Sequence, residues 1–193
     1  MSPDNPIRSI VMTSSVPNEG KSTCSVELAR AIATSGKTVL LVEADMRRRT
    51  LASLLNVRPA AACTPSSPMR HRSRRPSRRR RLPTCSSSTS SRTIPNPADI
   101  ISSKRYQKLV ATLEDSYDYV IYDMPPVGTF VDAAILSTLV DGTVLVVKPG
   151  STKRSELVDA CEQLKKADAN ILGICATSAK HRFRILFAYY NQG

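Results

Sequence analysis

One lysine and two carboxylates, each in or next to a polar segment that follows a short apolar run, are the residues of this chain best suited to chemistry. The lysine, Lys21, lies in residues 14–23, which read S-S-V-P-N-E-G-K-S-T and follow the apolar run 10–12. A strand, a polar turn with Gly-Lys-Ser and a helix form a phosphate-binding loop, because backbone N–H groups then face an anion and the lysine adds positive charge. Ser22 would offer its hydroxyl to the Mg²⁺ ion that accompanies a nucleotide.

The loop departs from the pattern G-x-x-x-x-G-K-[ST] at its first position, where Ser15 replaces glycine. Asn18 lies in the middle of the turn, and asparagine tolerates the left-handed backbone region better than most residues. An ordinary strand-turn-helix is the alternative, but both flanks match what the motif requires. We expect the nucleotide to be bound by Ser15, Asn18, Glu19, Gly20, Lys21, Ser22 and Thr23.

The two carboxylates follow other apolar runs. Residues 39–42 end in E-A-D-M-R, which contains Asp45, and residues 119–122 end in Asp123 and then Met-Pro-Pro. Ligands bind at the carboxyl ends of the strands in open α/β sheets. Asp123 is expected to hold the metal directly or through water. For Asp45, capping of a helix is the alternative.

Strands and helices alternate in this pattern, which predicts one α/β domain over residues 1–193, with a mostly parallel sheet and helices on both faces. The apolar runs predict strands at 10–12, 39–42, 119–123, 143–147 and 171–176. Helical spacing predicts helices at 25–35, 51–57, 98–116 and 156–167, the first of which would end at Gly36.

Composition excludes several classes of protein. The sequence contains no run of 18 or more apolar residues, the length needed to cross a membrane. Its polar N-terminus lacks the apolar core of a signal peptide. The five cysteines are odd in number and have no C-x-x-C spacing, so they fit neither a disulfide framework nor a zinc site. We therefore expect a chain that works in the reducing cytoplasm.

The net charge of +12 comes mainly from one segment. Ten arginines lie between residues 58 and 92, so the rest of the chain carries about +2 (12 − 10). Residues 59–91 contain no aromatic residue and no hydrophobic periodicity, which predicts a low-complexity segment that cannot order itself. We expect no specific nucleic acid partner, although an arm that binds polyanions is a weaker alternative.

Three stretches together resemble the bacterial tyrosine autokinases of capsule and exopolysaccharide synthesis, which are relatives of the partitioning and division-site ATPases. S-S-V-P-N-E-G-K-S-T resembles the Walker A loop of that family, V-L-L-V-E-A-D-M-R-R its Walker A′ motif and Y-V-I-Y-D-M-P-P its Walker B motif. I-P-N-P-A-D-I-I and D-G-T-V-L-V-V also match. The resemblance covers roughly residues 7–57 and 92–176.

The resemblance implies a role for each matching residue, with ATP and Mg²⁺ as cofactors. Lys21 would bind the β- and γ-phosphates, Ser22 the metal and Thr23 the α-phosphate. Asp45 would act on the metal or on the proton of an attacking tyrosine, and Asp123 would orient the metal through water.

The implied function is protein-tyrosine autophosphorylation that regulates polysaccharide synthesis and export, with a membrane-anchored co-polymerase as activator and tyrosine-bearing proteins as substrates. Family members act at the inner face of the cell membrane. Tyr189 and Tyr190, in a C-terminal tail over 181–193, would accept the phosphate. The alternative is a partitioning-type ATPase switch that binds a partner without phosphorylating tyrosine.

Four departures from the family pattern bear on these expectations. Glu43 replaces the first Walker A′ aspartate, and Thr177 stands where relatives often carry asparagine near the base. The sequence starts just before the first strand, without the helix that builds the family's ring. Self-association is still expected, but this chain alone is expected to have weak activity. Residues 59–91 fit nothing in the family although their flanks do. Two compensating frameshifts would explain this segment, and a genuine basic linker is the alternative. In either case we expect the sheet to lack a strand within residues 59–91.

Overall fold

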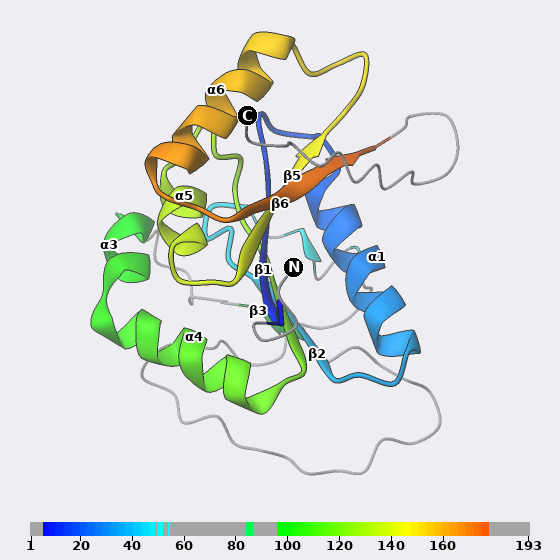
Figure 1. Ribbon diagram of the computed structural model, residues 1–193, viewed down its shortest axis with the longest axis vertical. Helices are drawn as coiled ribbons and strands as arrows, with labels where there is room; N and C mark the ends of the chain where they lie inside the picture. Colours follow the sequence, from blue (N-terminus) through cyan, green and yellow to red (C-terminus); the bar gives the residue numbers. More distant parts are fainter. Residues whose placement is uncertain (1–5, 49, 52–53, 55–83, 87–95, 178–193) are drawn as a thin grey trace.

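The structure is a computed structural model that describes residues 6–48, 50–51, 54, 84–86 and 96–177 of the chain. Within these residues, six strands form one parallel sheet in the order β3-β2-β4-β1-β5-β6 (Figure 1). The strands are β1 (Ser9–Ser14), β2 (Val39–Glu43), β3 (Thr84–Ser86), β4 (Tyr119–Asp123), β5 (Gly142–Val147) and β6 (Ile171–Ala176). The helices are α1 (Lys21–Thr34), α3 (Pro97–Ser102), α4 (Lys104–Ser116), α5 (Asp132–Ser137) and α6 (Arg154–Lys166).

Helices cover both faces of the sheet, as the alternating pattern predicts. On one face, α1 packs Val26 and Ala29 against side chains of β1, β2 and β4 such as Met12 and Leu41. On the other face, the helices α3 to α6 enclose a second core that contains Tyr122 (Figure 1). None of the helices in the described ranges is long and apolar enough to cross a membrane.

The five strands predicted from apolar runs are all present. Every residue of β1 and β2 is buried, which explains why both read as continuous apolar runs rather than alternating ones. The first predicted helix, α1, begins four residues before residue 25, where the sequence predicts its start, and ends close to Gly36 as expected. Gly36 has a φ of 92° and donates its N–H to the carbonyl of Ala33, which closes the helix.

The single helix predicted over 98–116 is wrong, because Ser103 divides it into α3 and α4. Ser103 has an extended backbone, and its hydroxyl accepts the N–H of Tyr106, so it caps the start of α4. The helix α5 was not predicted, since six residues carry too little periodicity. Most of the predicted helix over 51–57 lies outside the described residues, although Leu51 and Leu54 are helical.

The expectation that the sheet lacks a strand within residues 59–91 is also wrong. Thr84–Ser86 forms β3, which pairs in parallel with Leu41–Glu43 of β2. A short strand joins a sheet through backbone hydrogen bonds, so three residues can add to an open edge without any hydrophobic pattern. The other residues of this segment lie outside the described part of the chain.

The cap at Ser103 provides a test of this fold. Replacing Ser103 by Ala should lower the free energy of unfolding by about 1 kcal/mol, because the first turn of α4 loses its side-chain acceptor. Denaturant unfolding measures this change. Ser116→Ala is the control, since its hydroxyl only bonds the Thr112 carbonyl on an exposed surface. Equal stability of the two variants would contradict the assigned cap.

Candidate active site

The register of the sheet brings the three predicted motifs to one edge. Asp123 of β4 lies beside Met12 of β1 on one side and beside Glu43 of β2 on the other. Because the three strands are parallel, the segments that follow them leave the sheet at the same edge. The phosphate loop after β1 therefore meets the carboxylates at the ends of β2 and β4.

The loop has the backbone that an anion site needs. Asn18 has a φ of 66° and Gly20 a φ of 90°, so asparagine does supply the left-handed conformation expected of it. Gly20 is the N-cap of α1, and no side chain caps the helix there. No acidic residue lies in the first turn of α1. The N-terminal amides and the positive end of the helix dipole therefore favour an anion at this point.

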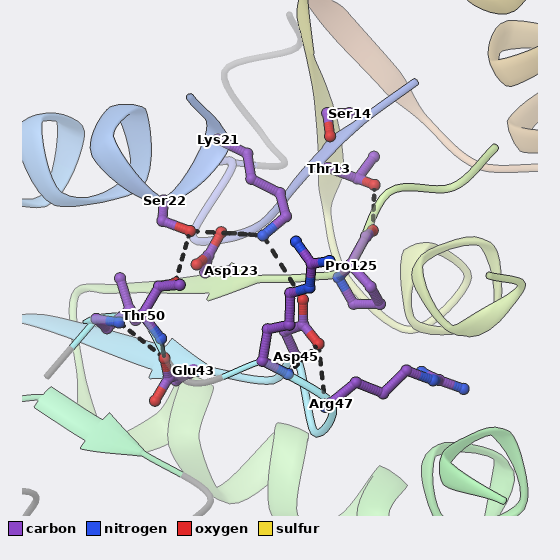
Figure 2. Close-up of polar contacts among 12 residues, drawn as sticks. Thr13, Ser14, Lys21, Ser22, Glu43, Asp45, Arg47, Thr50, Asp123 and Pro125 are labelled. Carbon is purple, nitrogen blue, oxygen red and sulfur yellow. Dashed lines mark hydrogen bonds and ion pairs between the residues drawn. The ribbon is translucent and has the colours of Figure 1, made fainter. Parts of the chain in front are cut away.

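Lys21 extends from α1 between the two carboxylates, as Figure 2 shows. Its Nζ lies 3.7 Å from Asp45 Oδ2 and 3.7 Å from Asp123 Oδ1, and 3.4 Å from the Ser22 hydroxyl. The lysine is only 13% exposed, so its charge is largely removed from water. The structure thus brings together the lysine and both acids that the sequence singled out.

Asp123 is fully buried and only partly satisfied. Its Oδ1 accepts a long hydrogen bond of 3.4 Å from Ser25, while Oδ2 has no hydrogen-bond partner among the described residues. Burial raises the pKa of Asp123 to about 6, against the opposing effect of Lys21. A buried carboxylate oxygen without a partner is suited to a water molecule or cation at this site.

Asp45 and Glu43 divide the helix-capping and charge-pairing roles. Asp45 Oδ1 accepts the N–H groups of Arg47 and Arg48 at 3.1 and 3.0 Å, while its Oδ2 faces Lys21. Glu43 Oε1 accepts the N–H groups of Thr50 and of the helical residue Leu51. Asp45 therefore both fixes the turn that follows it and pairs with Lys21, whereas Glu43 binds the backbone N–H groups of Thr50 and Leu51.

Ser22 reaches the same region from α1. Its hydroxyl lies 3.1 Å from the hydroxyl of Thr50, whose backbone N–H is held by Glu43 (Figure 2). Thr23 is exposed at the start of α1, and Ser15 is buried. Tyr189 and Tyr190 lie outside the described residues.

The donor set fits a nucleotide-bound magnesium ion. The described ranges contain no group of three or more His, Cys, Asp or Glu residues that could hold a metal ion. Mg²⁺ in nucleotide sites is usually held by one or two protein oxygens together with phosphates and water. Ser22 and the buried, partnerless oxygen of Asp123 provide oxygens of this kind.

Comparison with known proteins places this geometry in a family. The family model described as ParA, a NUBPL iron-transfer P-loop NTPase, matches residues 7–181. The tyrosine-protein kinase YwqD of Bacillus subtilis is 32% identical over 191 residues, which covers 97% of this chain and 79% of that protein. The tyrosine-protein kinase CpsD of Streptococcus agalactiae is 30% identical over 200 residues and covers 95% and 81%. The crystal structure of the chimerical protein CapA2B2 is 30% identical, with a TM-score of 0.77 over 93% of this chain and 79% of that chain.

This chain belongs to the bacterial tyrosine autokinases. Within that family of P-loop NTPases, the Walker A, A′ and B assignments made from the sequence correspond to the loop before α1 and to the ends of β2 and β4.

One contact of this autokinase was not predicted. Arg47 donates through Nη1 to Asp132 at the start of α5, and its guanidinium lies 3.9 Å from the centre of the Phe130 ring. The Arg47–Asp132 ion pair connects the Walker A′ turn to the segment that follows the Walker B strand. Its partners are 85 residues apart, so no local spacing in the sequence indicates it.

The buried Asp123 gives this autokinase a pH-dependent stability in the absence of nucleotide. Because its folded-state pKa is raised from 3.8 to about 6, ionisation costs stability as the pH rises through that value. Asp123→Asn should therefore raise the free energy of unfolding by about 1–3 kcal/mol near pH 8, and by much less near pH 4.5.

Denaturant unfolding at the two pH values measures this effect. Asp159→Asn, an exposed change on α6, is the control and should shift stability by less than about 0.5 kcal/mol at either pH. If Asp123→Asn destabilises the protein equally at both pH values, the charge of Asp123 is not the cause.

Proposed function

We propose that this chain is a protein-tyrosine kinase that transfers the γ-phosphoryl group of ATP to tyrosine hydroxyls. The observation that carries the proposal is the position of Lys21, which lies 3.7 Å from Asp45 and 3.7 Å from Asp123 beside the N-terminus of α1. Phosphoryl transfer depends mainly on positioning and on neutralising charge, and this arrangement offers both. The named tyrosine-protein kinases among its relatives support the choice of acceptor.

Each residue has a distinct role in this mechanism. The amides at the start of α1 bind the phosphates, Thr23 binds the α-phosphate, and Lys21 turns toward the β- and γ-phosphates. Magnesium, when bound, neutralises charge on the phosphates. Ser22 and Asp123 would hold the metal, Asp123 by orienting it through water. Asp45 accepts the proton of the attacking tyrosine or acts on the metal.

The phosphate acceptors are proposed to be Tyr189 and Tyr190 of a neighbouring subunit, because a C-terminal tail can reach a second active site. Through this reaction the kinase would regulate capsule or exopolysaccharide synthesis. A membrane-anchored co-polymerase would activate it at the inner face of the cell membrane, and other tyrosine-bearing proteins would be further substrates. This part of the proposal rests on the resemblance of the three Walker motifs to those of the tyrosine autokinases.

A nucleotide-dependent switch is the second candidate function. It is favoured by the match of the ParA family model over residues 7–181. In such a switch, Asp45 and Asp123 would direct a water molecule instead of a tyrosine hydroxyl. Incubation with ATP and Mg²⁺ separates the two functions, because only the kinase accumulates phosphotyrosine.

The charge of Lys21 provides the main test. Lys21→Met should lower phosphotyrosine formation and ATP hydrolysis by about a hundredfold or more, because it removes the positive charge that lies beside Asp45, Asp123 and the N-terminus of α1. Lys37→Met is the matched control, since Lys37 is 56% exposed and pairs with Asp118 away from the site. Full activity of Lys21→Met would exclude this site as the centre of phosphoryl transfer.

The proposed acceptors are tested separately. Replacing both Tyr189 and Tyr190 by Phe should remove most of the incorporated phosphate while leaving nucleotide binding unchanged. Mass spectrometry of the phosphorylated chain locates the modified residues. Phosphate found only on other tyrosines, such as the buried Tyr122, would reject the assignment.

A further inference from the structure

We infer that Glu19 and Thr177 are positioning residues that brace the phosphate loop, and that Thr177 acts on this loop rather than on the nucleotide base. The inference rests on the proposed nucleotide site and deepens it. Glu19 is one of the residues that the sequence predicts to bind the nucleotide. Thr177 stands where relatives often carry an asparagine near the base.

Glu19 is directed into the protein although it belongs to the loop. Its side chain is 2% exposed, and its Oε2 accepts the N–H of Val16 at 2.8 Å. Its Oε1 accepts the hydroxyl of Thr152, which lies between β5 and α6. A buried carboxylate is costly unless both oxygens are hydrogen-bonded, and here the chain itself supplies both donors. The Glu19 side chain therefore holds the loop instead of contacting the phosphates.

Thr152 is itself fixed to the end of β5. Its hydroxyl oxygen accepts the N–H of Lys148 at 2.9 Å. The contact with Glu19 thus connects the phosphate loop to the segment between β5 and α6, 133 residues away in sequence.

Thr177 contacts the loop with both branches of its side chain. Its hydroxyl donates to the carbonyl of Glu19 at 2.8 Å and lies 3.2 Å from the carbonyl of Val147. Its methyl group packs against Gly20, where an added Cβ would lie only 3.2 Å from Thr177 Cγ2. Because a hydroxyl has one proton, a Thr177 that donates to the loop has none to donate to a base.

The brace acts on the residues directly before Lys21 and Ser22. Three segments meet there: the loop, the connection after β5 and the end of β6. Anion binding by backbone N–H groups depends on their being oriented before the ligand arrives. Glu19 and Thr177 fix that orientation from within the protein.

Nucleotide binding to the full chain tests the role of Thr177. Dissociation constants for ATP and GTP are measured with Mg²⁺ by displacement of a fluorescent nucleotide. Thr177→Val should weaken both by the same factor, roughly tenfold, because one hydrogen bond to the loop is lost whichever base is present. Thr177→Ser, which keeps the hydroxyl, should restore most of the affinity. Thr138→Val, which removes an exposed hydroxyl from the end of α5, is the control and should leave both constants unchanged.

The outcomes separate the alternatives. If Thr177→Val loses affinity for one nucleotide far more than for the other, Thr177 contacts the base. If its affinity for both is unchanged, Thr177 neither contacts the base nor supports the loop. If the unmodified chain binds neither nucleotide, the proposed function fails together with the brace. If it binds both but forms no phosphotyrosine, only the kinase proposal fails.

The part played by Glu19 is tested by a double-mutant cycle. Glu19→Gln and Thr152→Val should each weaken ATP and GTP binding equally, by about three- to tenfold, since each disrupts the same buried contact. Because Thr152→Val also removes the contact with Lys148, the double variant should be somewhat weaker than Glu19→Gln alone, but its loss of affinity should be clearly smaller than the two single losses combined. Additive losses would show that the two side chains act independently and would overturn the brace.

Discussion

The balance of charge around Lys21 is the constraint on which the site depends. Asp45 and Asp123 are 5% and 0% exposed, and two carboxylates so far removed from water repel each other unless a cation lies close to both. Lys21 can meet this need only if the ends of β2 and β4 and the start of α1 come together. The strand order β2-β4-β1 does this, since it puts the Walker B strand between the other two.

Much of the fold could be predicted because its strands are buried on both faces. Such strands are apolar over most of their length, and this makes them visible as short runs such as residues 10–12 of β1 and 39–42 of β2. The acids that follow the runs could then be placed at one edge of the sheet without any structure. The break at Ser103 could not be placed, because helical spacing continues across it and the extended backbone of one residue decides it. The strand β3 is formed by backbone pairing, which leaves no pattern in the side chains.

The roles of the two Walker A′ acids show a finer limit of sequence reasoning. The sequence offers Asp45 as a helix cap, yet it is Glu43 whose longer side chain reaches the N–H groups of Thr50 and of the helical residue Leu51. Asp45 is shorter and bonds the nearer N–H groups of Arg47 and Arg48. The choice depends on the course of the backbone after β2, which residue types alone do not specify. The contact of Arg47 with Asp132 depends in the same way on tertiary structure.

The site therefore joins a fixed part to an adjustable part. Glu19 and Thr177 make hydrogen bonds of 2.8 Å to the loop, which hold its backbone in one orientation. The two ion pairs of Lys21 are longer, at 3.7 Å, beyond the usual length of a hydrogen bond. An ammonium group held by charge without a short directional bond can turn toward an entering phosphate at small cost. If it turned, Asp45 and Asp123 would lose their cation, and buried carboxylates without one favour a metal ion or a proton in its place. In the proposed mechanism, binding of the phosphates and binding of the metal would thus be coupled through the single charge of Lys21.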